Sequence, residues 1–258
     1  MKIRCLIGLF GVVIGVGLLP AADPTPTPTE NVNLAARSIA RSARSTNVVP
    51  ATFRAHLVVD NRFKLMIKQP DGTETPDPRN RTGKLHCLVC EYGLSPVVAI
   101  FVRADTKGKG KDTGLGKLIM GIDELVPKYR ADKLAAFVMF LRLEGGPKPV
   151  TIKGPDGADQ KVESFKEYPD DEKREQYVNE IKTFAADVPA ENVPFGLAPV
   201  DSPSIRAFGI GEMTPVTVII YNRLRMVQRW DLTLNDLTDE KIAEIRNATE
   251  AMITGGKK

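Results

Sequence analysis

The chain has 258 residues, with 36 Lys and Arg against 32 Asp and Glu and a formal net charge of +4. Without its first 22 residues, which hold two of the basic side chains, 34 basic residues face 32 acidic ones and the charge falls to +2. So small an excess gives no support for nucleic-acid binding, and because no stretch repeats at a fixed period, a repeat architecture is not indicated.

Residues 1–22 have the layout of a secretory signal peptide. Two basic residues within the first four precede an apolar, uncharged run at 5–19, which ends at the small residues Ala21 and Ala22. The run is shorter than the roughly 20 residues that span a bilayer as a helix. We therefore expect cleavage near Ala22 and export to the periplasm or the extracellular space. Contact with a membrane is expected only if this segment stays uncleaved.

Residues 23–48 are expected to form a tether. The prolines of 23–30 (DPTPTPTE) favour neither helix nor core. In 33–45 (NLAARSIARSARS) Ser and Arg interrupt any apolar face, so this segment is either disordered or lies on a membrane surface. Folded structure is predicted for 49–258, which is long enough for one domain, with its core at about 85–250.

The hydrophobic pattern of this domain alternates between strand and helix. Residues 96–104 (PVVAIFVRA) and 134–143 (LAAFVMFLRL) are nearly unbroken apolar runs, typical of strands that are buried on both faces. Between them, apolar residues at 115–129 recur at helical spacing, with Pro127 expected to bend or end the helix.

The remaining elements are shorter or more amphipathic. They are, in chain order, a hairpin insertion at 145–163 around a Pro-Asp-Gly turn signal, a helix at 170–187, a strand at 193–199, a short helix at 205–208, paired strands at 216–221 and 224–230, and a helix capped by Thr238. Alternating strands and helices imply right-handed crossovers and a largely parallel sheet. We predict an α/β fold with a mixed central sheet and helices on both faces, in which 96–104, 134–143 and 216–221 are neighbours.

The stretch at 201–230 (DSPSIRAFGIGEMTPVTVIIYNRLRMVQRW) resembles the closing pattern of the thioredoxin-like superfamily. It reads as a short helix ending in Phe-Gly-Ile, an X-Pro that leads directly into a hydrophobic strand, a tight turn and a partner strand. The resemblance covers about 85–250 and implies a thioredoxin-like fold, and the extra helix and strand before residue 201 are more similar to the redoxin and peroxiredoxin branch. The family's cis proline beside the active site corresponds here to Pro215, after Thr214.

The sequence departs from this family where catalysis would occur. Thioredoxins place Cys-X-X-Cys just after the central strand, and peroxiredoxins place their reactive cysteine in the same neighbourhood. Here the residues at 104–116 (ADTKGKGKDTGLG) contain no cysteine, and Cys87 and Cys90 precede the strand. A thiol peroxidase of the usual kind is therefore not expected. The loop at 107–117 does not complete a phosphate-binding motif, so no cofactor is expected.

Cys87-Leu88-Val89-Cys90 is the most informative feature for function. Beyond the expected signal peptide these are the two cysteines of the chain, and in an oxidising compartment they should form a disulfide. The pair has three conceivable roles: a structural disulfide that holds the loop before the central strand, a redox exchange pair, or half of a metal site. Metal ranks last because only His56 and His86 could add nitrogen ligands.

We predict an exported thioredoxin-like protein in which Cys87 and Cys90 exchange electrons with a protein thiol or disulfide partner, without metal or cofactor. An imidazolium at His86 would favour thiolate at Cys87, so Cys87 is expected to be the exposed, attacking thiol and Cys90 the resolving one. The resemblance implies that Pro215 lines the place where a substrate strand rests. The alternative is a non-enzymatic binding or scaffold domain with a structural Cys87–Cys90 disulfide.

Overall fold

The computed structural model describes residues 47–50, 54–106, 110–142, 146–153, 157–166 and 170–255. The predicted signal peptide at 1–22 and nearly all of the predicted tether lie outside the described residues. At the start of the described chain, Val48 bridges to Arg225, so ordered contacts begin just before residue 49. No described helix is long and apolar enough to cross a membrane.

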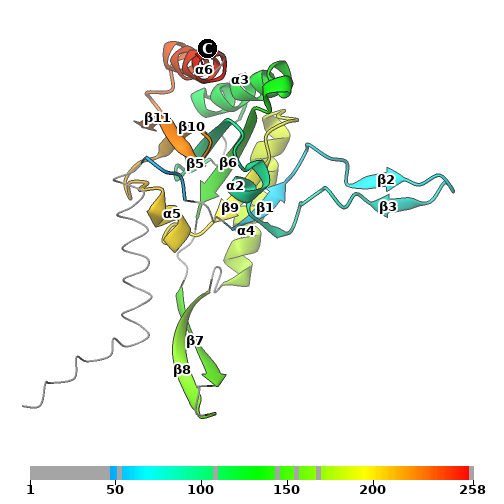
Figure 1. The fold of residues 1–258 in the computed structure, drawn as a ribbon, viewed down its shortest axis with the longest axis vertical. Coiled ribbons are helices and arrows are strands. Elements are labelled where there is room, and N and C mark those ends of the chain that lie inside the picture. Colours follow the sequence, from blue (N-terminus) through cyan, green and yellow to red (C-terminus); the bar gives the residue numbers. More distant parts are fainter. Residues whose placement is uncertain are drawn as a thin grey trace, which may run out of the picture.

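A seven-stranded mixed sheet forms the centre of the molecule (Figure 1). The strand order is β11-β10-β5-β6-β9-β1-β4. The bounds are β1 Ala55–Val59, β4 Leu85–His86, β5 Val97–Val102, β6 Ala135–Leu141, β9 Phe195–Ala198, β10 Val216–Asn222 and β11 Arg225–Leu232.

The middle of the sheet consists of the three hydrophobic segments that the sequence predicted as neighbours. Strand β5 is parallel to β6, with Val97 opposite Ala135, and antiparallel to β10, with Val102 opposite Val216. All six residues of β5 are buried, as expected for an apolar strand between two layers of helices. The parallel pair is joined through a helix, and the β10–β11 hairpin closes the sheet on one side. This arrangement confirms the predicted thioredoxin-like α/β fold.

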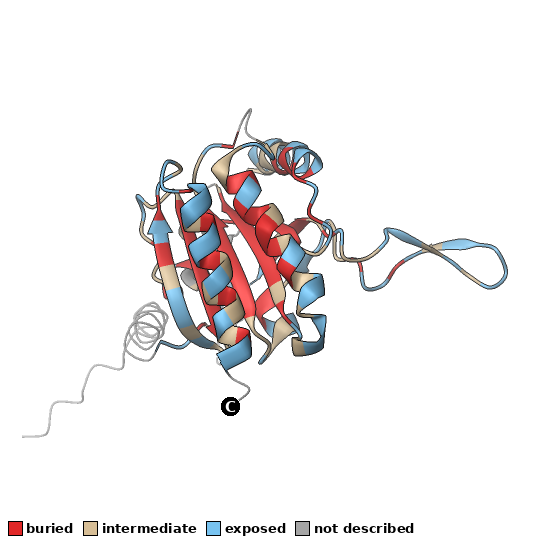
Figure 2. Ribbon diagram, turned by 90° about the horizontal axis from the view of Figure 1, so that it is seen from above, coloured by how far each residue is buried: buried red, intermediate tan, exposed pale blue. Residues whose placement is uncertain are grey.

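Helices cover both faces of the sheet. Three long helices, α3 (Gly114–Lys128), α4 (Asp171–Asp187) and α6 (Asp239–Gly255), contribute to one hydrophobic cluster with one face of the strands. The short helices α2 (Leu88–Tyr92) and α5 (Pro203–Ala207) pack on the opposite face, in the second cluster. Figure 2 shows long helices lying across buried strands, with their exposed residues on the outer side.

Local capping fixes where the long helices begin. Thr113 accepts a hydrogen bond from the amide of Gly116 at 3.2 Å, and Asp170 accepts one from Lys173 at 3.0 Å. The hydroxyl of Thr238 accepts from the amide of Lys241 at 3.3 Å, which confirms the predicted cap. Helix α3 continues one residue past Pro127, because a proline in the last turn removes only one hydrogen bond.

Two hairpins lie outside the main sheet (Figure 1). Strands β7 (Gly146–Lys153) and β8 (Asp159–Lys166) form the predicted insertion, which extends slightly beyond residue 163. Strands β2 (Met66–Lys68) and β3 (Glu74–Pro76) form a second hairpin that the sequence interpretation did not include. A 3-10 turn, η1 (Arg130–Asp132), links α3 to β6.

Candidate functional site

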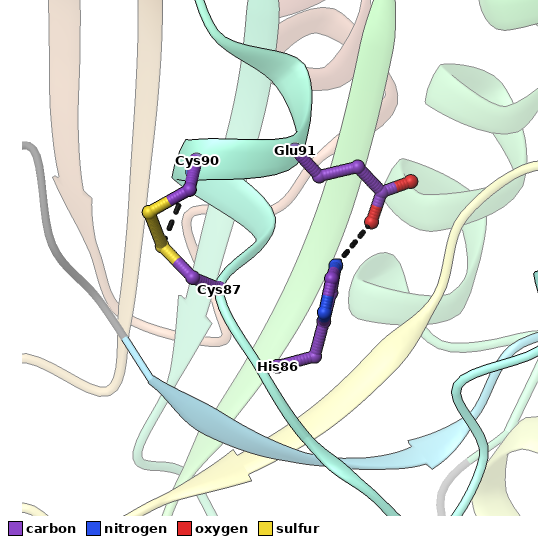
Figure 3. The surroundings of a disulfide bond; sticks show 4 residues. All are labelled: His86, Cys87, Cys90 and Glu91. Atoms are coloured by element: carbon purple, nitrogen blue, oxygen red, sulfur yellow. Dashed lines mark hydrogen bonds and ion pairs between the residues drawn. A yellow bond between two sulfur atoms is a disulfide. The ribbon is translucent and has the colours of Figure 1, made fainter.

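Cys87 and Cys90 form a disulfide on α2, with their Cα atoms 5.2 Å apart (Figure 3). This separation lies within the range of ordinary disulfides. Cys87 caps the helix in an extended conformation, and its Sγ accepts a hydrogen bond from the backbone amide of Cys90 at 3.1 Å. The fold therefore holds the two sulfurs together and directs one backbone donor at the first of them.

Helix α2, which carries the disulfide, is short because Gly93 ends it after five residues. Leu88 and Val89 are buried in the second cluster, which holds the first turn of α2 against the sheet. Gly93 stops the helix with φ of 55°, a conformation that glycine adopts readily, and its amide donates to the carbonyl of Val89 at 3.0 Å. The chain then enters β5 through Pro96.

The two cysteines differ in exposure, in the opposite sense to our expectation. Cys90 is exposed, whereas Cys87 is half-buried and packs against the second cluster. Cys87 lies directly after β4 at the sheet, and Cys90 follows the buried Leu88 and Val89 on α2. The expectation that Cys87 is the exposed thiol is therefore corrected.

Glu91, the residue after Cys90 on α2, belongs to a network of charged side chains. Glu91 accepts from Arg62 Nη1 at 2.7 Å, and one of its oxygens lies 2.6 Å from His86 Nε2. Arg62 also donates from Nε to Asp60 at 2.7 Å and from Nη1 to the Tyr92 hydroxyl at 2.8 Å. Burial alone would lower the pKa of Arg62, but its bonds to Asp60 and Glu91 raise the pKa overall.

His86 does not face the sulfurs. In Figure 3 its ring points toward Glu91, and the disulfide lies on the other side of α2. The imidazole therefore binds the Glu91 carboxylate, and its expected influence on the Cys87 thiol stays a prediction. The acidic partner could have been suspected from the sequence only through its closeness in the chain, five residues after His86.

Tyr92 fixes the end of α2 to the sheet. Its hydroxyl donates to the carbonyl of Ala136 at 3.2 Å, and its ring stacks on Phe137 with centroids 6.4 Å apart. Burial raises the pKa of Tyr92 well above its ordinary value, so the hydroxyl stays protonated and keeps donating. Tyr92 is thus part of the packing that joins the disulfide-bearing helix to the sheet.

Pro215 lies beside the segment that leaves β5. Its carbonyl accepts from the amides of Arg103 and Ala104 at 2.8 and 3.0 Å, whereas the Cys pair precedes β5 in the chain. No cis peptide bond occurs among the described residues, which include Thr214–Pro215. The prediction of a cis bond between Thr214 and Pro215, which the family resemblance implied, is therefore wrong. The substrate-strand role of Pro215 stays a prediction.

The segment that follows β5, where thioredoxin-like proteins carry a reactive cysteine, is held by an arginine that follows β6. Arg142 Nη1 donates to the carbonyls of Val102 and Arg103 at 3.2 and 2.9 Å, and Arg142 also donates to Ala104. Burial lowers the pKa of Arg142. Arg142 was not predicted from the sequence, and its guanidinium holds together the ends of β5 and β6.

Within the described ranges, no group of three or more His, Cys, Asp or Glu could hold a metal ion.

Comparisons with known proteins give structural matches alone. No protein-family model and no curated protein matches the sequence significantly. Peroxiredoxin Q of Xanthomonas campestris is 12% identical over 66% of this chain and 87% of its own, with a TM-score of 0.37. A yeast mitochondrial 1-Cys peroxiredoxin is 10% identical over 82% of this chain and 78% of its own, with a TM-score of 0.47.

A third match is a putative thiol:disulfide interchange protein DsbE from Chlorobium tepidum. It is 13% identical over 77% of this chain and 99% of its own, with a TM-score of 0.37. The fold assignment rests on the strand order and crossovers described above, and the chemistry of this chain rests on its own Cys pair.

Proposed function

We propose that this chain is an exported thioredoxin-like protein that exchanges electrons with protein thiols or disulfides through Cys87 and Cys90. The observation that carries the proposal is a Cys-X-X-Cys disulfide on a surface helix of a redoxin-like fold, with Cys90 exposed. Export is inferred from the signal-peptide pattern of residues 1–22.

The surroundings of the pair support exchange in physical terms. After reduction, the amide of Cys90, 3.1 Å from Cys87 Sγ in the disulfide form, is placed to stabilise a thiolate at Cys87. The network of Arg62, Glu91 and Tyr92 keeps α2 in place while the bond opens. In this proposal His86 acts by holding Glu91 and has no direct role at the sulfurs.

A scaffold domain with a structural disulfide is the second candidate. It is favoured by the residues at 103–116 after β5, which contain no cysteine where redoxins of the usual kind carry a reactive thiol. The packing of Cys87 against the second cluster also fits a bridge that holds α2 on the sheet.

An insulin-reduction assay with dithiothreitol separates the two candidates. We expect the protein to accelerate insulin precipitation and the Cys87→Ser/Cys90→Ser double variant to act no faster than the uncatalysed background. Far-UV circular dichroism of both proteins checks that the fold is kept. Equal rates for the wild type and the folded double variant would identify a scaffold.

A further inference from the structure

We propose that Cys90, the second cysteine of the pair, forms the mixed disulfide with the partner and that Cys87 is the resolving thiol. This inference rests on the proposed exchange function. It reverses the order that the chain position of His86 suggested. Two separate observations support it, one on access and one on the leaving sulfur.

Access favours attack at Cys90. Exchange requires the partner's sulfur to approach one sulfur of the bridge directly, so the rate depends on which sulfur can be reached. Cys90 is exposed, whereas Cys87 is half-buried against the second cluster, next to the fully buried Leu88. A protein partner therefore reaches Cys90 first.

The leaving sulfur favours the same order. Attack on Cys90 Sγ breaks the bridge so that its electron pair stays on Cys87 Sγ. That sulfur accepts the amide hydrogen of Cys90 at 3.1 Å. A hydrogen bond to the charged form lowers the pKa of a thiol, and a thiol of lower pKa leaves faster. The structure thus places the stabilising donor at the sulfur that must leave.

The complete exchange balances without any further reactant. A partner thiolate joins Cys90 Sγ, and Cys87 leaves as thiolate. A second partner thiolate then attacks the partner's own sulfur, so the partner becomes a disulfide while Cys90 leaves as thiolate and takes up a proton from solvent. In the reductive direction Cys90 gives its proton to solvent and attacks a partner disulfide, so that the first partner sulfur leaves as thiolate. The Cys87 thiolate then attacks Cys90 Sγ and the second partner sulfur leaves as thiolate, and both partner thiolates take up protons from solvent.

Single-cysteine variants of the full chain test this order, with insulin as the disulfide probe. Without a resolving thiol, the mixed disulfide should accumulate. We expect Cys87→Ser to form an insulin adduct at Cys90 at least about tenfold faster than Cys90→Ser forms one at Cys87. Peptide mapping by mass spectrometry locates the adduct, and circular dichroism checks the fold of both variants.

The outcomes separate this inference from the proposed function. If the wild type reduces insulin above background, three results would overturn the order: faster adduct formation by Cys90→Ser, equal formation by both variants, or formation by neither. In each of these cases the exchange function would still stand. Wild-type turnover at the background rate would show that the exchange function itself is absent, and the inference would fail with it.

Discussion

Replacing Arg62 by methionine should lower the free energy of unfolding by about 3–5 kcal/mol. The Asp60 side chain is 0% exposed and its Arg62 partner is 13% exposed, so the variant leaves a carboxylate buried without its cation. Methionine keeps much of the length of the aliphatic stem, so the loss reports the charge and its hydrogen bonds. Urea denaturation at neutral pH measures the change.

Two matched variants make this result specific. Lys128→Met removes the cation of an exposed pair with Glu250, and we expect a loss below about 1 kcal/mol. In Asp60→Asn/Arg62→Met the uncompensated charge is gone, so the double variant should be more stable than Arg62→Met alone. If Arg62→Met cost no more than Lys128→Met, the buried network would not be what holds α2 beside β1.

Replacing Phe140 by alanine should also lower the free energy of unfolding by about 3–5 kcal/mol. Phe140 is fully buried in β6. Its ring meets Phe184 of α4 edge to face at 5.5 Å between centroids and stacks on Phe195 at 6.4 Å. Truncation removes the contacts that join the sheet to α4 and leaves a cavity.

Two further variants serve as controls for the free energy of unfolding of Phe140→Ala, measured by denaturant unfolding. Phe140→Leu keeps most of the volume, so we expect a clearly smaller loss. Leu94→Ala removes a side chain that is 66% exposed and should change stability by no more than about 0.5 kcal/mol. A loss for Phe140→Ala as small as that for Leu94→Ala would contradict the three-layer packing.

The central strands could be predicted because their residues leave few alternatives. Apolar runs such as Val97–Val102 must be buried on both faces, and the intervening helical pattern brings the next strand back in parallel. The short strands of 54–86 could not be found in the same way. Strands such as Met66–Lys68 alternate half-buried and exposed residues over three positions, which is too brief a pattern to recognise.

The disulfide was predictable from spacing, but its surroundings were not. Which cysteine is exposed depends on how Leu88 and Val89 pack α2 against a sheet formed mostly by later residues. The hydrogen bond between Arg62 and Glu91 joins residues 29 positions apart, so no local sequence pattern predicts it. The trans bond before Pro215 has the same origin, because tertiary contacts and not the X-Pro dipeptide select the isomer.

The redox role depends on the Cys87–Cys90 bridge opening and closing while the protein stays folded. Equilibration in dithiothreitol or glutathione redox buffers, with circular dichroism recorded at each point, measures its reduction potential most directly. We predict reversible reduction of the native protein at a potential above about −300 mV. A potential below about −300 mV, or thiols that appear only once the chain has unfolded, would contradict the redox role and identify a structural bridge.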